Sequence, residues 1–179
     1  MVYIILGAGF EESEAIVPCD LLRRAGVQTR LVGLGGTEIV GGHGITVRAD
    51  CTAEETDLTE AEMLVLPGGL GGVRSICGAE TVLSALKTVS ARGGYVAAIC
   101  AAPTVLAQLG ITDGRDATCY PGMENEMNGA RMTDAPAVRD GKVITGKAAG
   151  TAFDFGLLLV ETLCGGDAAR KVKDAVVYR

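Results

Sequence analysis

Short apolar segments alternate with longer amphipathic ones along most of the chain. The apolar segments lie next to glycine and predict buried strands over Val2–Leu6, Val27–Leu34, Met63–Leu66, Tyr95–Ile99 and Lys142–Thr145. The amphipathic segments predict helices over Ser13–Ala25, Glu80–Arg92, Ala102–Leu109, Thr151–Leu163 and Asp167–Val176. This alternation is typical of a mostly parallel sheet with helices on both faces, so we expect an α/β fold.

One segment departs from the alternation. Glu38–Ala49 has two β-prone halves around Gly41-Gly42-His43-Gly44, which predicts a hairpin that decorates one edge of the sheet. The sequence contains no internal repeat, no low-complexity tract and no long linker. Residues 1–179 are therefore expected to form a single domain.

The charge balance and the scarcity of histidine exclude several function classes. Sixteen Lys and Arg face twenty-two Asp and Glu, a net charge of −6 without a basic stripe, so no nucleic-acid partner is expected. The single histidine, His43, leaves no pair for a histidine-based metal site, and no metal is expected. No apolar run approaches the about 20 residues that span a bilayer, so no membrane association is expected.

The cysteines and the N-terminus indicate the compartment. Six cysteines at irregular spacing do not suggest a disulfide framework in a chain of 179 residues. The first residues lack the basic and apolar regions of a signal peptide. We therefore expect free thiols in the cytoplasm.

Two glycine-rich turns follow predicted strands. Gly7-Ala8-Gly9 stands where a dinucleotide fold carries its fingerprint, but Glu11 and Glu12 follow and would repel a pyrophosphate, so a nucleotide cofactor is disfavoured. The second turn, Leu66 to Gly72, lacks the ending of a phosphate-binding loop. It is either a tight turn that needs positive φ or a set of backbone amides that approach a reacting oxyanion.

Cys100 is the best candidate for a nucleophile. It lies between the predicted strand Tyr95–Ile99 and a helix whose first turn contains Pro103. The amides and partial positive charge of a helix N-terminus favour a thiolate, so we expect a lowered thiol pKa. The alternative is a small buried residue near a strand end, as we expect for Cys19, Cys77 and Cys164, and for Cys119 unless it is a second thiol near the pocket.

Carboxylates gather at the start of the first predicted helix. Complementation of the helix dipole can explain Glu11 and Glu12, while Pro18 keeps Glu14 in or just before the first turn. The loops after the first, third and fourth predicted strands converge at one edge of a parallel sheet. Glu14, Gly68-Gly69 and Cys100 are therefore expected to share a pocket, where a carboxyl beside a thiolate stays protonated and carries a proton.

Four motifs in chain order carry a family resemblance: Glu11-Glu12-Ser13-Glu14, Leu66-Pro67-Gly68-Gly69, Ala97-Ala98-Ile99-Cys100-Ala101-Ala102-Pro103 and Gly150-Thr151-Ala152-Phe153-Asp154-Phe155. Together they resemble the ThiJ/PfpI superfamily, in the branch of the Parkinson-disease-associated deglycase (DJ-one) and its bacterial relatives. The resemblance implies a flavodoxin-like three-layer sandwich, a homodimer and an oxidation-sensitive Cys100 hydrogen-bonded to Glu14. It further implies an oxyanion site at the amides of Gly69 and Ala101, and an Arg24 that lies near the partner's active site.

The sequence also departs from the pattern of this family. Tyr120 stands before Pro121 where many members have a histidine, and His43 replaces an arginine that is common in the hairpin. The residue after Cys100 is Ala101 rather than the histidine of the family's peptidases, which weakens the hypothesis of a peptidase function. Glutamine amidotransferases need a downstream histidine, and none follows His43.

Two functions remain open at this point. The first is a cofactor-free glyoxalase or deglycase acting on methylglyoxal-type dicarbonyls or their adducts on proteins and amino acids, with Cys100 as nucleophile, Glu14 as proton carrier, and Gly68, Gly69, Ala101 and Tyr120 around the substrate. The second is a stress sensor or chaperone-like protein that uses oxidation of Cys100 with little turnover. Both use the same thiol and carboxyl, so the sequence does not separate them.

Overall fold

The computed structural model describes residues 1–179 and contains one large sheet. Its strands are β1 (Val2–Leu6), β2 (Thr29–Gly33), β5 (Cys51–Thr52), β6 (Met63–Leu66), β7 (Tyr95–Ile99), β10 (Ala137–Asp140) and β11 (Val143–Gly146). They are arranged in the order β10-β11-β7-β6-β1-β2-β5. All neighbouring strands run parallel except β10, which is antiparallel to β11.

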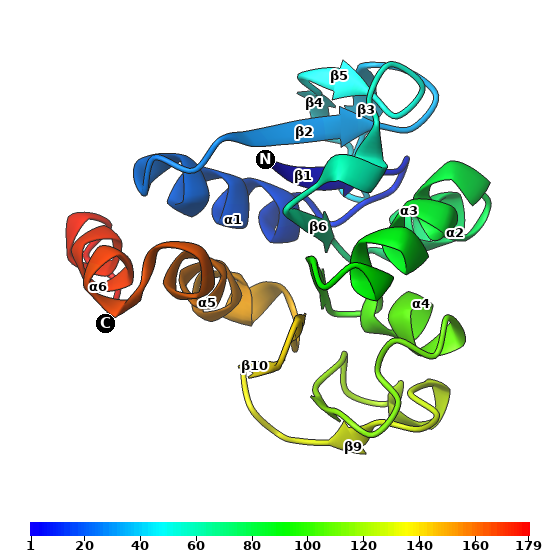
Figure 1. Cartoon of the computed structure of the whole chain (residues 1–179). Helices are drawn as coiled ribbons and strands as arrows, with labels where there is room; N and C mark the ends of the chain where they lie inside the picture. Colours follow the sequence, from blue (N-terminus) through cyan, green and yellow to red (C-terminus); the bar gives the residue numbers. More distant parts are fainter.

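Helices cover both faces of this sheet. On one side lie α1 (Glu12–Arg24), α5 (Ala152–Cys164) and α6 (Gly166–Ala175), and on the other lie α2 (Leu70–Cys77), α3 (Glu80–Ala91) and α4 (Pro103–Gln108) (Figure 1). Three short 3-10 turns span Leu58–Glu60, Glu124–Glu126 and Ala149–Thr151. The predicted three-layer α/β sandwich with a mostly parallel sheet is confirmed.

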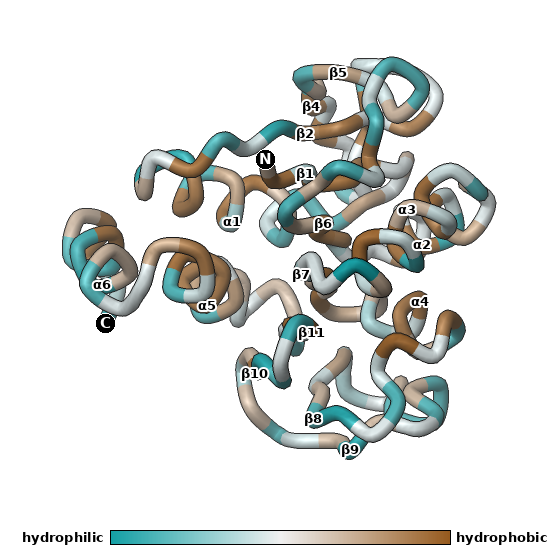
Figure 2. Tube along the Cα trace, in the orientation of Figure 1, coloured by the Kyte–Doolittle hydropathy of each residue, from teal (hydrophilic) through white to brown (hydrophobic).

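The two faces of the sheet form two separate hydrophobic cores. In β1, Ile4 packs toward the α1 and α5 side, whereas its neighbour Ile5 packs toward the α3 side. The same alternation continues through β6 and β7, because successive side chains of a strand point to opposite faces. Figure 2 shows the apolar positions concentrated in these strands and on the inward sides of the helices. Burial on both faces explains why the strands read as continuous apolar runs.

The predicted hairpin forms, but it does not extend the large sheet. β3 (Glu38–Val40) and β4 (Thr46–Arg48) pair only with each other, and the edge position next to β2 belongs to β5. The hairpin is attached instead to the loop after β1, where Gly9 N–H donates to the carbonyl of Val40 at 2.8 Å. It therefore lies beside the start of α1.

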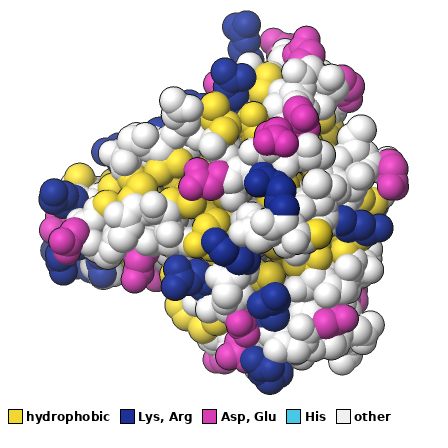
Figure 3. Space-filling view, viewed as in Figure 1, with side chains coloured by type: hydrophobic (Ala, Val, Ile, Leu, Met, Phe, Trp, Pro, Cys, Tyr) yellow, Lys and Arg dark blue, Asp and Glu magenta, His cyan; other side chains and the backbone are white.

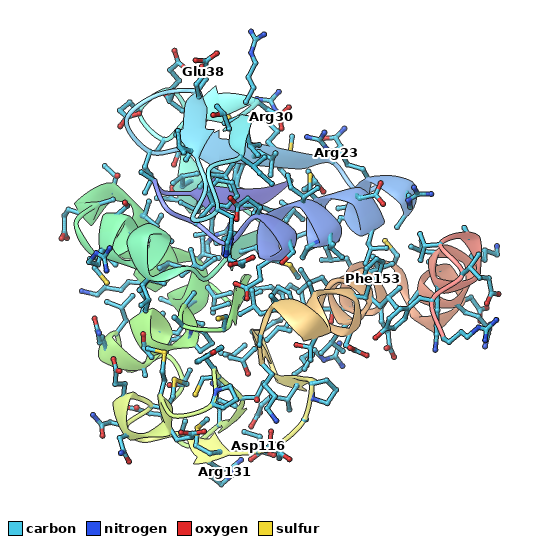
Figure 4. All side chains as sticks on the ribbon, turned by 180° about the vertical axis from the view of Figure 1, so that it is seen from behind. Arg23, Arg30, Glu38, Asp116, Arg131 and Phe153 are labelled. Atoms are coloured by element: carbon cyan, nitrogen blue, oxygen red, sulfur yellow. The ribbon has the colours of Figure 1, made fainter.

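Two further features were not predicted from the sequence. β8 (Asp116–Ala117) and β9 (Arg131–Met132) form a small separate sheet, across which Arg131 and Asp116, both labelled in Figure 4, pair at 2.7 Å. The second feature is α2, which begins with Leu70-Gly71-Gly72, a poor helix-forming sequence. A Cβ on Gly71 would lie 2.8 Å from the Cα of Gly9, so these glycines allow close packing against the β1–α1 loop.

The order of the strands fixes where a ligand can bind. The chain moves outward from β1 in one direction to β2 and in the other to β6 and β7, so the carboxyl ends of β1 and β6 flank a topological switch point.

The helices are all too short or too polar to cross a bilayer. On the face drawn in Figure 3, basic and acidic side chains are interspersed rather than gathered into one patch.

Candidate active site

Cys100 lies directly after β7 in a strained backbone conformation. Its φ is +66°, and it is one of two residues other than glycine with a positive φ. Such a conformation costs about 1–3 kcal/mol and is common at functional sites. Backbone hydrogen bonds hold it on both sides: Cys100 N–H donates to Gly146 at 3.0 Å, and Tyr120 N–H donates to the carbonyl of Cys100 at 2.8 Å. The turn presents the thiol at the carboxyl edge of the sheet, as a nucleophile elbow does.

Two backbone amides point at the sulfur of Cys100. The N–H groups of Ala101 and Gly69 both act to lower the pKa of this thiol, and neither has a backbone acceptor. Gly69 reaches this position with a φ of +82°, and a Cβ there would lie 2.6 Å from the backbone nitrogen of Glu11. The positive φ of Gly69 confirms the predicted tight turn, and the same turn brings an N–H to the Cys100 thiol.

Glu14 is buried beneath the thiol, in the first turn of α1. Its Oε2 accepts a 2.8 Å hydrogen bond from Gly68 N–H. The other oxygen, Oε1, is buried without an N–H or O–H partner, and the thiol of Cys100 is the side chain that interacts with this carboxyl. Burial, outweighing the hydrogen bonds to Cys100 and Gly68, raises the pKa of Glu14 to about 7. The carboxyl can therefore gain and lose a proton near neutral pH.

The expected lowering of the thiol pKa was wrong. Burial first, and then the charge and hydrogen bond of Glu14, raise the pKa of Cys100 to about 12, and the amides of Ala101 and Gly69 offset only part of this rise. The helix dipole contributes little because α4 starts only at Pro103 and has six residues. While Glu14 is ionised, its charge helps to keep Cys100 a thiol.

Gly68 has a different role from the expected one, which was to contact the substrate. Its N–H is occupied by Glu14, and the residue does not line the pocket, so it positions the carboxyl rather than touching a substrate. A Cβ at Gly68 would lie 2.6 Å from Oε2 of Glu14 and 2.7 Å from the Cβ of Cys100. Only glycine lets the carboxyl and the thiol come this close together.

The thiol opens into a pocket of about 510 Å³. Cys100, Gly69, Ala101 and Tyr120 line it, as expected, and Tyr120 is 48% exposed. Glu11 also lines it. The sequence analysis did not predict this, because complementation of the helix dipole was enough to explain a carboxylate at that position. Leu70, from the second glycine-rich turn, and the segment Pro121 to Met123 complete the wall, and the sequence analysis gave none of them a role in the site.

Other candidate residues lie away from this pocket. Arg24, at the far end of α1, pairs with Asp20 at 2.7 Å, so within one chain it does not reach the site. Cys119 is buried in a small cluster with Ala117 and Met127 and does not line the pocket. The expectation of small buried cysteines holds for Cys19 and is wrong for Cys77 and Cys164, which are exposed at the ends of α2 and α5.

His43 is an exposed turn residue, as predicted, but it makes contacts that the sequence did not reveal. Its Nδ1 lies 2.9 Å from Oε2 of Glu12 and 3.5 Å from Oε2 of Glu11. The hydrogen bond to Glu12 and the charges of Glu11 and Glu12 raise the pKa of His43. Burial raises the pKa of Glu12, but its hydrogen bonds with the ring and backbone of His43 outweigh this, so its pKa is lowered.

The atoms of Glu11, Glu12 and His43 lie within 4.8 Å of one another, as metal ligands do. Oε1 of Glu12, however, already accepts the His43 N–H at 2.8 Å and the Ile45 N–H at 3.4 Å, and its Oε2 lies 2.9 Å from Nδ1 of His43. The group is therefore a hydrogen-bonded clamp that ties the hairpin to the start of α1.

Comparison with known proteins gives one consistent result. The model of the DJ-1/PfpI family matches residues 1–162. The chain is 37% identical to the protein dj-1beta of Drosophila melanogaster over 172 residues, which cover 94% of this chain and 92% of the relative. It is 34% identical to a protein named deglycase from Pyrococcus abyssi, over 85% of this chain and 92% of the relative.

Solved structures agree with this likeness. The crystal structure of Drosophila melanogaster DJ-1beta superposes with a TM-score of 0.95 at 35% identity, over 99% of this chain and 97% of that one. The flavodoxin-like architecture extends over nearly the full length of both chains. This chain belongs to the DJ-1/PfpI family.

Proposed function

We propose that this protein is a cysteine-dependent glyoxalase or deglycase that acts on methylglyoxal-type dicarbonyls, free or as adducts on proteins and amino acids. The observation that carries the proposal is the buried carboxyl of Glu14, with one unpartnered oxygen, beside a thiol that also faces two backbone amides. The likeness to a relative named deglycase supports the same class of substrate.

The first step joins the thiol to the substrate. The sulfur of Cys100 attacks the aldehyde carbon, the thiol proton passes to the carboxylate of Glu14, and the carbonyl electron pair moves to the oxygen. The amides of Gly69 and Ala101 stabilise this alkoxide, which takes up a proton to give a hemithioacetal. Because the pKa of Glu14 is raised to about 7, it is a stronger base than an ordinary carboxylate and can still return the proton near neutral pH.

The remaining steps move a hydrogen within the substrate. Glu14 removes the proton from the former aldehyde carbon and returns it to the adjacent ketone carbon. The hydroxyl proton of the first carbon passes to the oxygen on its neighbour. One carbon is thereby oxidised and its neighbour reduced, so the lactoyl thioester forms without an external oxidant or reductant. Water then cleaves the thioester, releasing lactate and the Cys100 thiol.

Tyr120 contributes a hydroxyl to the pocket where many relatives have a histidine. A phenol hydroxyl donates a hydrogen bond but is a poor base. In this proposal Tyr120 binds the substrate and Glu14 carries out every proton transfer, so turnover is expected to be slow.

The sensor alternative draws on the same residues but has less support. Oxidation of a cysteine begins with its thiolate, and the pKa of Cys100, raised to about 12 by burial and by Glu14, keeps the thiol protonated at neutral pH. Turnover of a carbonyl needs the thiolate only transiently, with Glu14 as the base. The protonated thiol is therefore more consistent with the proposed enzyme than with the sensor.

We also propose that two copies assemble, with Arg24 of one copy near the pocket of the other. Three apolar residues are exposed on α1 and the hairpin, which the N–H of Ile45 ties to Glu12 at the start of α1. Ile16 is 40% exposed on α1, and Val40 and Ile45 are 51% and 57% exposed on the hairpin. Exposed apolar side chains that gather in this way commonly mark an interface. Light scattering at micromolar concentration should give twice the mass of the chain; a monomer would contradict the assembly.

The function is tested by the production of lactate from methylglyoxal in the absence of glutathione. Wild-type protein should produce lactate, and Cys100→Ser should lose at least about 99% of the rate because serine is a poor nucleophile here. Cys77→Ser is the matched control, since Cys77 is an exposed cysteine that does not line the pocket, and it should retain the full rate. Full activity in Cys100→Ser would contradict the proposal.

A further inference from the structure

Thr145 carries a buried hydroxyl that the proposed reaction does not use. It lies on β11, whose other residues are Val143, Ile144 and Gly146, so it is the only polar side chain of this strand. A hydroxyl in such apolar surroundings is unfavourable unless it is hydrogen-bonded, and a valine would have nearly the same shape. The partner of this oxygen therefore indicates what the hydroxyl does.

The hydroxyl oxygen of Thr145 accepts the backbone N–H of Thr118 at 2.9 Å. Both residues are 1% exposed, and the N–H of Thr118 has no backbone acceptor. A buried N–H that loses its partner is destabilising. Thr118 follows β8, which belongs to the small separate sheet, so this bond ties the chain leaving that sheet to the large one.

A second hydrogen bond ties the same segment to the large sheet two residues later. Tyr120 N–H donates to the carbonyl of Cys100 at 2.8 Å, at the end of β7, the strand next to β11. Between the two bonds, Cys119 packs into the cluster that contains Ala107 and Met127. Thr145 and Cys100 thus hold residues 118–120 from two neighbouring strands.

The place of Tyr120 in the pocket depends on this segment. Its side chain lines the pocket and is 48% exposed, so packing restrains only part of it. A displacement of about 1 Å in a group that binds substrate can lower a rate about 100-fold. Thr145 does not line the pocket, yet it fixes the backbone that carries a lining residue.

We propose that Thr145 is a positioning residue of this site: its hydroxyl holds residues 118–120 on the sheet so that Tyr120 faces the thiol of Cys100. The contact of Tyr120 with substrate rests on the proposed function, whereas the positioning of Tyr120 does not. Without the hydroxyl, one end of the segment is released and the bond to the carbonyl of Cys100 is its remaining tie.

Three variants test this anchor. Thr145→Val removes the acceptor and keeps the shape, whereas Thr145→Ser keeps the oxygen. Thr29→Val is the matched control, because Thr29 is a buried threonine of β2 that does not line the pocket, and its hydroxyl donates to the carbonyl of Val27 at 3.1 Å. Each protein is labelled with meta-fluorotyrosine, and Tyr120→Phe identifies the fluorine resonance of Tyr120 among those of the four tyrosines.

The fluorine spectrum reports the position of Tyr120 without reference to catalysis. Thr145→Val should shift or broaden the resonance of Tyr120 and leave those of the other three tyrosines in place. Thr145→Ser and Thr29→Val should leave all four unchanged. A general loss of stability would not single out Tyr120 in this way.

Kinetics with methylglyoxal test the consequence for the substrate. Thr145→Val should raise KM about tenfold, the size of one lost hydrogen bond, with kcat within about twofold of wild type, and Thr145→Ser should restore KM. In the Tyr120→Phe background that hydrogen bond is already absent. There Thr145→Val should change KM by less than about twofold, because the two substitutions act on the same contact.

A Tyr120 resonance that stays in place in Thr145→Val, or that moves equally in Thr145→Ser, would overturn the inference. So would independent effects of Thr145→Val and Tyr120→Phe on KM. In wild-type protein the Thr118 amide should exchange with deuterated water at least about 100-fold more slowly than an unstructured amide, and fast exchange would overturn the inference whatever the variants do. If no lactate forms but the Tyr120 resonance moves as expected, the proposed function fails and the positioning by Thr145 stands.

Discussion

Replacing Glu14 with glutamine measures the cost of ionising a carboxyl inside the site. Burial raises the pKa of Glu14 from 4.5 to about 7 in the folded protein, whereas the unfolded chain keeps the ordinary value. Between these two pH values the folded state binds more protons than the unfolded state. The contribution of Glu14 to stability is therefore most favourable below pH 4.5, decreases as the pH rises, and levels off above about 7.

The size of this loss of stability follows from the difference between the folded and unfolded pKa values of Glu14. At about 1.4 kcal/mol per pH unit, the rise from 4.5 to about 7 corresponds to about 3 kcal/mol, of which about 2–3 kcal/mol falls between pH 5 and pH 8. Glu14→Gln removes the charge and retains an oxygen that can accept from Gly68 N–H. The variant should gain this amount over wild type when the pH is raised from 5 to 8.

Urea unfolding of both proteins at pH 5 and at pH 8 gives the four free energies that are needed. His43 also titrates in this range, but it is present in both proteins and cancels in the comparison. The stability difference between variant and wild type should move by about 2–3 kcal/mol in favour of the variant at pH 8. The same pH dependence in both proteins would refute a carboxyl whose ionisation opposes folding.

Three further substitutions test separate parts of the site. Cys100→Gly should be about 1 kcal/mol more stable than Cys100→Ala in thermal unfolding, because glycine adopts the φ of +66° without strain; a less stable glycine variant would contradict the strained turn. Gly68→Ala should lose most lactate production and about 2 kcal/mol of stability, since its Cβ collides with Glu14 and Cys100, while Gly150→Ala, in open space, should change neither. His43→Gln should remove a pH dependence of amide hydrogen exchange in the hairpin. Because the pKa of His43 is raised in the folded protein, its contact with Glu12 slows exchange below pH 6.5 and weakens as the pH rises through the folded-state pKa. The same dependence of exchange rate on pH in both proteins would exclude the clamp.

Much of the sheet could be predicted because its strands are buried on both faces. β1, β6 and β7 occur with the predicted bounds, since unbroken apolar runs next to glycine leave few other choices. The elements that were not predicted are α2 and the short strands β5, β8, β9 and β10. In α2, Gly71 and Gly72 allow a close approach to the β1–α1 loop. A contact between segments so far apart in sequence is not visible in local composition.

Part of the lining of the candidate site could be predicted, but its electrostatics could not. Parallel topology brought Glu14, Gly69 and Cys100 to one edge, because the loops after β1, β6 and β7 converge there. The helix start beside Cys100 suggested a lowered thiol pKa, yet the depth of burial and the adjacent carboxyl raise it. Burial and distance decide that balance, and neither can be read from the order of residues. For the same reason, the hydrogen bond from Gly68 N–H to Glu14 could not be predicted from the sequence.

The central claim is that Glu14 moves the proton while Cys100 forms the bond, and the Glu14→Gln variant separates the two most directly. Without the carboxylate, the pKa of the Cys100 thiol should fall, so its alkylation by iodoacetamide at pH 7 should become faster. Lactate production from methylglyoxal without glutathione, measured on the same sample, should fall by about 100-fold or more because no base remains to carry the proton. A Glu14→Gln protein that produces lactate at the wild-type rate would contradict the account.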